Sequence, residues 1–98
     1  MRNKSLNLIW GNDLKELGYS KKSVNHFEKK YKKHKLCIDY DLMGYILMFR
    51  ILGFDAFNKT KCIKYKDIKN MDSLTQIEFI NLVNKIENEF KLFIENEE

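Results

Sequence analysis

The chain has 98 residues, of which 44% are hydrophobic, and it carries a formal net charge of +4. This length holds one domain with a modest core and excludes two independent domains, while the apolar content excludes wholesale disorder. The apolar run at residues 42–49 is well short of the roughly 20 residues that cross a bilayer, so we expect one soluble domain over residues 1–98 and no membrane partner.

Charge is distributed unevenly along the sequence. Residues 1–35 hold ten Lys or Arg and three Asp or Glu, whereas residues 71–98 hold two and seven. A basic first third is compatible with nucleic-acid contact and also with an ordinary solvated surface. The chain has 16 Lys and only two Arg, as an AT-rich bacterial or phage genome would encode, so the abundance of Lys is weak evidence by itself.

The cysteines and histidines bear on the cellular compartment and on metal binding. Residues 1–10 contain no apolar stretch of the length of a secretory signal, so we expect a cytoplasmic protein with free thiols at Cys37 and Cys62. His26, His34 and the two cysteines could gather around zinc, but only His34 and Cys37 have the local spacing of ligands. Without a second tight pair, we expect neither a metal site nor a cofactor.

Residues 12–35 predict a helix-turn-helix. The first helix begins at Asn12 or Asp13, whose side chains are typical helix caps, and it ends at Gly18. A helix-turn-helix needs a glycine where the first helix breaks and a hydroxyl cap on the next helix, and Gly18 and Ser20 supply both.

The second helix is expected to begin after Ser20. Val24, Phe27 and Tyr31 recur at helical spacing, which gathers them on one buried face. Lysines fall on the opposite face, and the run at residues 29–35, KKYKKHK, is suited either to phosphate contacts or to a solvated helix end.

The segment around the turn is similar to a known family. Residues 19–29, YSKKSVNHFEK, resemble the recognition helix of the MerR-like branch of winged helix-turn-helix proteins. Residues 49–54, FRILGF, resemble the end of a later helix of that family. The resemblance implies a DNA-binding domain with room for a short β-wing, and a dimer in which the C-terminal helix pairs with that of a second copy.

A recognition helix of this kind would contact double-stranded DNA in the major groove. Its N-terminal residues reach base edges while lysines contact phosphates. Asn25 is the most specific candidate, because an amide can bind adenine at two points. The expected DNA-binding residues are Ser20, Lys21, Lys22, Asn25, His26, Lys29, Lys32 and Lys33.

The middle of the chain, residues 39–70, is expected to hold a third helix and a connector. Asp39 or Asp41 can cap a helix whose apolar residues run over 42–52. Residues 36–40 suit a short strand or a turn, and residues 61–68 alternate in a way that suits a strand or a helix.

The C-terminal segment, residues 73–94, predicts a long helix. Ser73 and Gln76 form a capping box at its start. Apolar residues then follow at spacings of four and three, which places them on one stripe that serves either as core or as a dimer or partner interface. This stripe consists of Phe79, Val83, Ile86, Phe90 and Phe93.

Together these elements predict a mainly α fold, a small helix-turn-helix domain with a long C-terminal helix. The sequence has no Gly-rich phosphate loop and no zinc-protease helix, so we do not expect an enzyme. We expect first a small basic DNA-binding transcriptional regulator of phage or plasmid type. The alternative is a small phage or mobile-element inhibitor of the anti-CRISPR or anti-defence type, which would bind a host nuclease or defence complex without catalysis.

Overall fold

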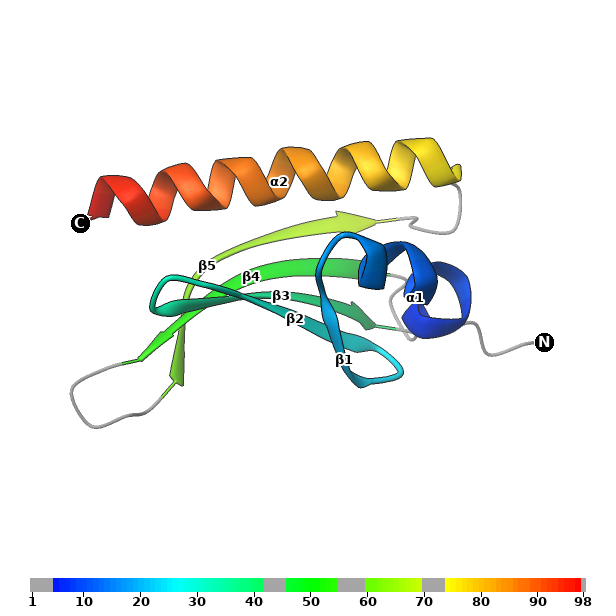
Figure 1. The fold of residues 1–98 in the computed structure, drawn as a ribbon, viewed down its shortest axis with the longest axis horizontal. Coiled ribbons are helices and arrows are strands. Elements are labelled where there is room, and N and C mark those ends of the chain that lie inside the picture. Colours follow the sequence, from blue (N-terminus) through cyan, green and yellow to red (C-terminus); the bar gives the residue numbers. More distant parts are fainter. Residues whose placement is uncertain (1–4, 42–45, 55–59, 70–73, 98) are drawn as a thin grey trace.

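The computed structural model describes residues 5–41, 46–54, 60–69 and 74–97. Its elements in chain order are α1 (Leu6–Glu16), β1 (Ser20–Ser23), β2 (His26–Tyr31), β3 (His34–Asp41), β4 (Ile46–Phe54), β5 (Thr60–Lys69) and α2 (Gln76–Glu97). The strands form one antiparallel sheet in the order β1-β2-β3-β4-β5, so each strand pairs with the next along the chain. Helix α2 lies across one face of this sheet, and α1 lies beside β1 (Figure 1).

The core lies between α2 and the sheet. Phe27 pairs with Ile38, and Ile38 pairs with Phe49, so one buried apolar row crosses β2, β3 and β4. Each such side chain contributes roughly 1.5–3 kcal/mol by leaving water. The buried residues of α2 that complete this core are Phe79, Val83, Ile86, Phe90 and Ile94.

The expectation of a mainly α fold with a helix-turn-helix was wrong. The segment expected to form the second helix instead forms β1 and β2, joined by a turn at Val24 and Asn25. Phe27 and Tyr31 are four residues apart, and a separation of four fits one face of a strand as well as one face of a helix. Pairing with β3 makes the segment a strand and not a helix. Val24, which was expected on the buried face, lies outside the core at 51% exposure.

The expected middle helix was also wrong. Residues 34–41 and 46–54 form β3 and β4, and residues 42–45, where the helix would begin, lie outside the described residues. A short apolar run is typical of a buried strand as well as of a buried helix. Here β4 lies inside the sheet between β3 and β5, which explains why its residues are largely apolar. The strand alternatives at 36–40 and 61–68 are the ones observed.

The C-terminal helix was predicted with its first and last residues three positions too early. It begins at Gln76, and its capping box is formed by Thr75 and Glu78: Oγ1 of Thr75 accepts from the Glu78 N–H, and Oε1 of Glu78 accepts from the Thr75 N–H. Ser73 lies outside the described residues. Of the predicted stripe, four residues are buried in the chain's own core and Phe93 is half-buried. The stripe therefore packs against the chain's own sheet.

Helix α1 begins earlier than predicted, at Leu6, and is capped by the Ser5 hydroxyl. Its Trp10 stacks on Phe79 of α2 with ring centroids 4.4 Å apart, which joins the two helices over the sheet. Gly18 follows the helix with a φ of +97°, a conformation that favours glycine, so its role as a helix terminator is confirmed. None of the described helices is long and apolar enough to cross a membrane.

Candidate functional site

The sheet face opposite α2 carries most of the polar chemistry of the chain. Successive side chains of a strand point to opposite faces, so the neighbours of the buried apolar row lie on this other face. Glu28 pairs with Cys37, Cys37 pairs with Arg50, and His26 pairs with Asp39. No described helix covers this face in Figure 1, and we call it the open face. Its central residues are His26, Glu28, Lys30, Lys35, Cys37, Asp39 and Arg50.

A network of alternating charges crosses the open face. Nε2 of His26 lies 2.7 Å from Oε2 of Glu28, and Nδ1 of the same ring donates to Asp39, because an ionised carboxylate can only accept. Oδ2 of Asp39 also accepts from Arg50, at 3.0 Å from Nε and 2.5 Å from Nη2. Nζ of Lys35 lies 3.6 Å from Oε1 of Glu28. Glu28 thus links His26 to Lys35, and Asp39 links His26 to Arg50.

The network shifts the pKa values of its members. Partial burial lowers the pKa of His26, but the hydrogen bonds to Glu28 and Asp39 outweigh it, so the net shift is upward. Burial raises the pKa of Glu28, and His26 and Lys35 outweigh it, so the net shift is downward. Burial and the nearby Glu28 charge raise the pKa of the Cys37 thiol to about 12. Cys37 is therefore a neutral thiol at pH 7, unsuited to act as a nucleophile.

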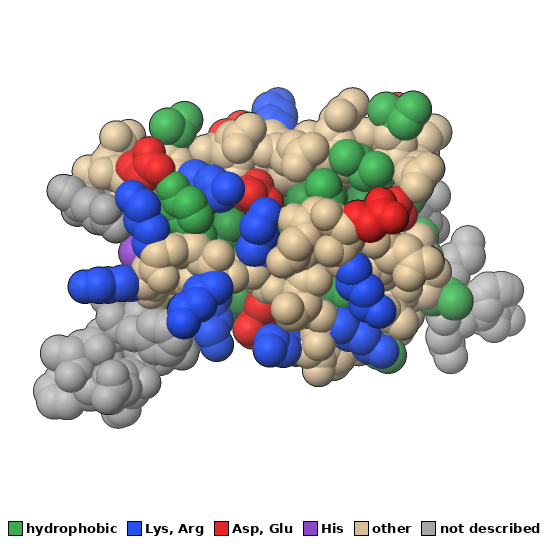
Figure 2. Space-filling view, viewed as in Figure 1, with side chains coloured by type: hydrophobic (Ala, Val, Ile, Leu, Met, Phe, Trp, Pro, Cys, Tyr) green, Lys and Arg blue, Asp and Glu red, His purple; other side chains and the backbone are tan. Residues whose placement is uncertain are grey.

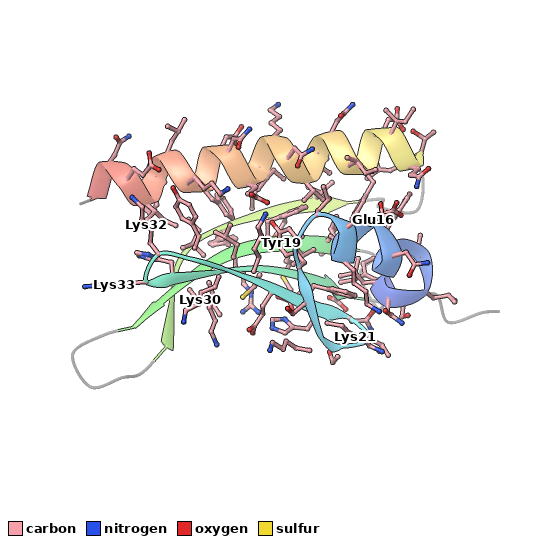
Figure 3. The ribbon with its side chains drawn as sticks, in the orientation of Figure 1. Glu16, Tyr19, Lys21, Lys30, Lys32 and Lys33 are labelled. Carbon is pink, nitrogen blue, oxygen red and sulfur yellow. The ribbon has the colours of Figure 1, made fainter. Side chains whose placement is uncertain are left out.

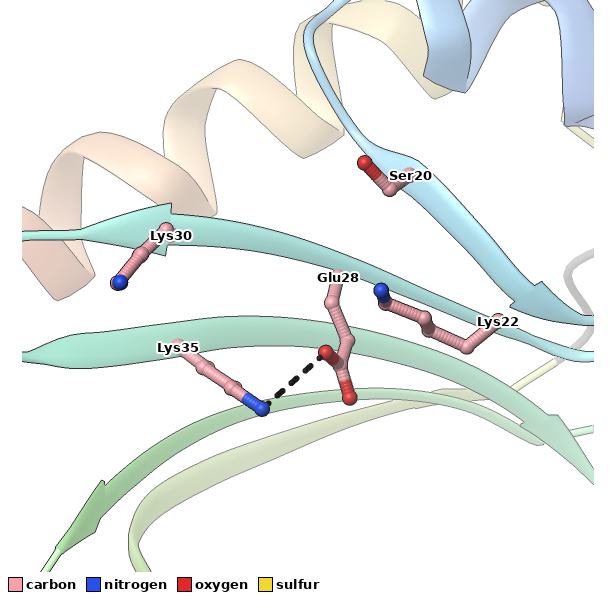
Figure 4. Close-up of a pocket in the computed structure, with 5 residues that line it drawn as sticks. All are labelled: Ser20, Lys22, Glu28, Lys30 and Lys35. Carbon is pink, nitrogen blue, oxygen red and sulfur yellow. Dashed lines mark ion pairs between the residues drawn. The ribbon is translucent and has the colours of Figure 1, made fainter.

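A hollow opens on this face beside the network. It is lined by Ser20 and Lys22 of β1, Glu28 and Lys30 of β2, and Lys35 of β3 (Figure 4). Three cations thus surround one carboxylate, and only Lys35 forms an ion pair with it. The hollow carries a net positive charge and a hydroxyl, which suits an anionic ligand.

Two further lysines are exposed outside the hollow. Lys21 is exposed on β1, and Lys33 is exposed in the two-residue turn between β2 and β3. Figure 3 shows Lys21, Lys30 and Lys33 spread along the side of the molecule away from α2. Figure 2, which views the molecule from the side, shows Lys and Arg side chains below α2. Within the described parts of the chain, Lys21, Lys22, Lys30 and Lys33 form no ion pair, so their charges are available to a partner.

The residues predicted to bind DNA divide into two groups in the structure. Ser20 and Lys22 line the hollow, Lys21 and Lys33 are exposed outside it, and His26 belongs to the neighbouring network. The second group is Asn25, Lys29 and Lys32.

The second group makes contacts within the chain. Oδ1 of Asn25 accepts from the Leu6 N–H at 2.8 Å, where α1 begins. Nζ of Lys29 lies on the α2 side of the sheet, 2.9 Å from the Leu17 carbonyl oxygen. Nζ of Lys32 lies 4.0 Å from Glu95 of α2. These three side chains hold α1, β2 and α2 together, whatever else they contact.

Two residues of the open face, Glu28 and Arg50, were not identified from the sequence, and Lys30 and Lys35 were named only as part of the basic run at residues 29–35. Apolar Leu36, Ile38 and Tyr40 alternate with Lys35, Cys37 and Asp39, which is the signal that a strand interpretation would have used. Lys29 interrupts the same alternation in residues 26–31. The sequence spacing of His34 and Cys37 suits two ligands of one metal ion. In the structure these two side chains do not share a face of the sheet. Residues three apart in a strand lie on opposite faces, and His34 faces the side of Tyr31, with which it pairs.

Comparison of the chain with protein-family models, with curated protein sequences and with solved structures found no match in any of the three. The function is therefore argued from the geometry of the open face.

Proposed function

We propose that the protein is a non-enzymatic nucleic-acid-binding protein that contacts the phosphate backbone through the hollow on its open face. The observation that supports this is the arrangement of Lys22, Lys30 and Lys35 around a single carboxylate, Glu28, on a sheet face that no described helix covers. Lysines that neutralise phosphates release counterions, and this release supplies most of the affinity of such proteins.

The mode of contact differs from that of a helix-turn-helix. β1, β2 and β3 are adjacent strands of one five-stranded sheet, so the face that they share, and not a helix, would lie against the nucleic acid. The side chains that line the hollow are mainly cationic, and cations position a protein on the phosphates without reading sequence. We therefore expect weak preference between sequences and a strong dependence on salt.

The test is a salt titration with a fluorescent random-sequence DNA duplex, followed by anisotropy. Three to five phosphate contacts give a slope of log K against log salt between about −2.7 and −4.5. The double variant Lys22→Ala/Lys30→Ala should bind less tightly and bring the slope closer to zero by about 1.8.

The matched control is Lys15→Ala/Lys85→Ala, which removes the same charge from exposed positions on α1 and α2. This control should keep most of the affinity and the slope. If both double variants lose affinity equally, the binding is not localised to the hollow. If the wild-type protein binds no DNA or RNA at low salt, the proposal is wrong and a protein partner, as an inhibitor of a host complex would have, becomes the better explanation.

A further inference from the structure

Four side chains form a two-by-two block on the open face. His26 and Glu28 are two residues apart on β2 and therefore point to the same face. Cys37 lies opposite Glu28 in the register with β3, and Asp39 lies opposite His26. One ligand atom each from His26, Glu28 and Cys37 lies within 4.8 Å of the other two. An imidazole nitrogen, a carboxylate oxygen and a sulfur thus lie close together.

We propose that His26, Glu28 and Cys37 bind a divalent transition-metal ion, with Zn²⁺ as the best fit. Nitrogen, oxygen and sulfur are the three donor types that Zn²⁺ accepts, at about 2.0–2.3 Å from the ion. Thiolate and imidazole together disfavour Mg²⁺ and Ca²⁺, which prefer oxygen ligands. The three ligand atoms lie within 4.8 Å of one another and would move closer together to bind such an ion.

A second layer of contacts orients the histidine for this role. Metal-binding histidines almost always donate their other ring N–H to a carboxylate or a carbonyl. Nδ1 of His26 donates to Asp39, and Asp39 is itself held by Arg50. Nε2 is therefore the ring nitrogen that faces Glu28. These contacts fix the orientation of the His26 ring before any ion binds.

The charges of the site are compatible with a bound ion. Glu28 and the Cys37 thiolate would neutralise Zn²⁺. On binding, the thiol proton and the Nε2 proton that His26 directs at Glu28 would both pass to solvent. The second-layer charges of Asp39 and Arg50 cancel one another. Three protein ligands leave one coordination position of a tetrahedral Zn²⁺ ion for water or an anion. Glu28 also lines the hollow, but the metal proposal does not depend on nucleic-acid binding.

The test uses Co²⁺ as a spectroscopic substitute for Zn²⁺ in the reduced, full-length protein. We expect one Co²⁺ per chain, the intense visible bands of a four-coordinate ion, a near-ultraviolet thiolate charge-transfer band, and displacement of Co²⁺ by Zn²⁺. Cys37→Ser should abolish the charge-transfer band. Cys62→Ser, at the second cysteine of the sequence, is the matched control and should keep it.

If Cys37→Ser fails to fold, substitutions at the two partly exposed ligands still test the proposal. His26→Gln and Glu28→Gln should each weaken Co²⁺ binding at least tenfold. Asp39→Asn should weaken it by about 10- to 100-fold, as expected for a partner of a metal-binding histidine. The proposal is overturned if the wild-type protein gives no charge-transfer band with Co²⁺ in slight excess. It is equally overturned if the band is lost in Cys62→Ser and kept in Cys37→Ser, or if His26→Gln and Glu28→Gln bind Co²⁺ as tightly as the wild type.

Discussion

The hydroxyl of Tyr19 donates a 2.9 Å hydrogen bond to Oε1 of Glu87, which joins the segment before β1 to the middle of α2. The other carboxylate oxygen, Oε2, lies 3.0 Å from Nζ of Lys29 on β2 and 2.8 Å from Nζ of Lys91 on α2. Glu87 is only 8% exposed. A nearly buried carboxylate therefore links the sheet to the helix through one hydroxyl and two cations.

Replacing this carboxylate should destabilise the fold. We predict that Glu87→Gln lowers the free energy of unfolding by about 2–3 kcal/mol, because it removes charge-assisted hydrogen bonds and leaves Lys29 partly buried beside a neutral group. Urea denaturation measures the change. The matched control is Glu89→Gln on the same helix, whose ion pair with Lys66 is exposed and should contribute less than about 1 kcal/mol. Equal losses in the two variants would contradict the prediction.

The contribution of Glu87 should also depend on pH. Burial raises the pKa of this carboxyl, but its bonds to Lys91, Lys29 and Tyr19 outweigh burial and hold the pKa below the ordinary value of 4.5. A depressed pKa in the folded state means that the stabilisation is complete above pH 4.5 and is lost as the pH falls through the folded-state pKa. The stability gap between wild type and Glu87→Gln should thus be constant from pH 7 to about 5 and shrink below 4.5. A stability gap that widens on acidification would show that folding raises the pKa of Glu87 and does not lower it.

Asn25 should act on stability, because its side chain accepts the N–H of Leu6 where α1 begins. We predict that Asn25→Ala lowers the free energy of unfolding by about 1–2 kcal/mol, the range typical of a lost cap or an unmade hydrogen bond to a helix end. Thermal and urea denaturation measure this change, and duplex affinity at fixed salt should stay unchanged. The control is Asn84→Ala at an exposed position of α2, which should not destabilise the fold. A loss of duplex affinity in a stable Asn25→Ala protein would restore the base-contact interpretation.

The apolar stripe of α2 should behave as core. Ile86 is 0% exposed, so we predict that Ile86→Glu abolishes folding, because it places an unpaired carboxylate in the interior. Circular dichroism measures the loss of structure. Ile77→Glu is the control, since Ile77 lies on the same helix at 71% exposure and should change stability by less than about 0.5 kcal/mol. A folded, monomeric Ile86→Glu protein would instead show that the stripe is an interface between copies.

Some of this fold was readable from the sequence. The C-terminal helix was predicted to within three residues at each end, because apolar residues spaced by four and three over several turns fit a helix and no other regular structure. Gly18 was correctly placed at the end of the first helix, since a positive φ there favours glycine. The excess of basic residues near the N-terminus was visible as well, though not the surface that they share.

The strands were not readable in the same way. Phe27 and Tyr31 fit a helix and a strand equally, and the apolar residues of β4 fit any buried element. Local pattern could not decide, because the stabilisation of a strand comes from hydrogen bonds and side-chain pairs with residues that lie elsewhere in the chain. In this chain β2 obtains these hydrogen bonds and side-chain pairs from β3, so the segment forms strands and no helix-turn-helix.

The open face shows most clearly what tertiary structure decided. His26 and Glu28 share a face only because their segment is a strand, since in a helix residues two apart point in different directions. Cys37 lies opposite Glu28 only because a two-residue turn, with Lys32 at a φ of +55°, sets the register of β2 with β3. A shift of one residue would send Cys37 and Asp39 to the α2 side of the sheet. The donor groups and the long helix can be read from the residues along the chain, whereas the strand register brings those donors together.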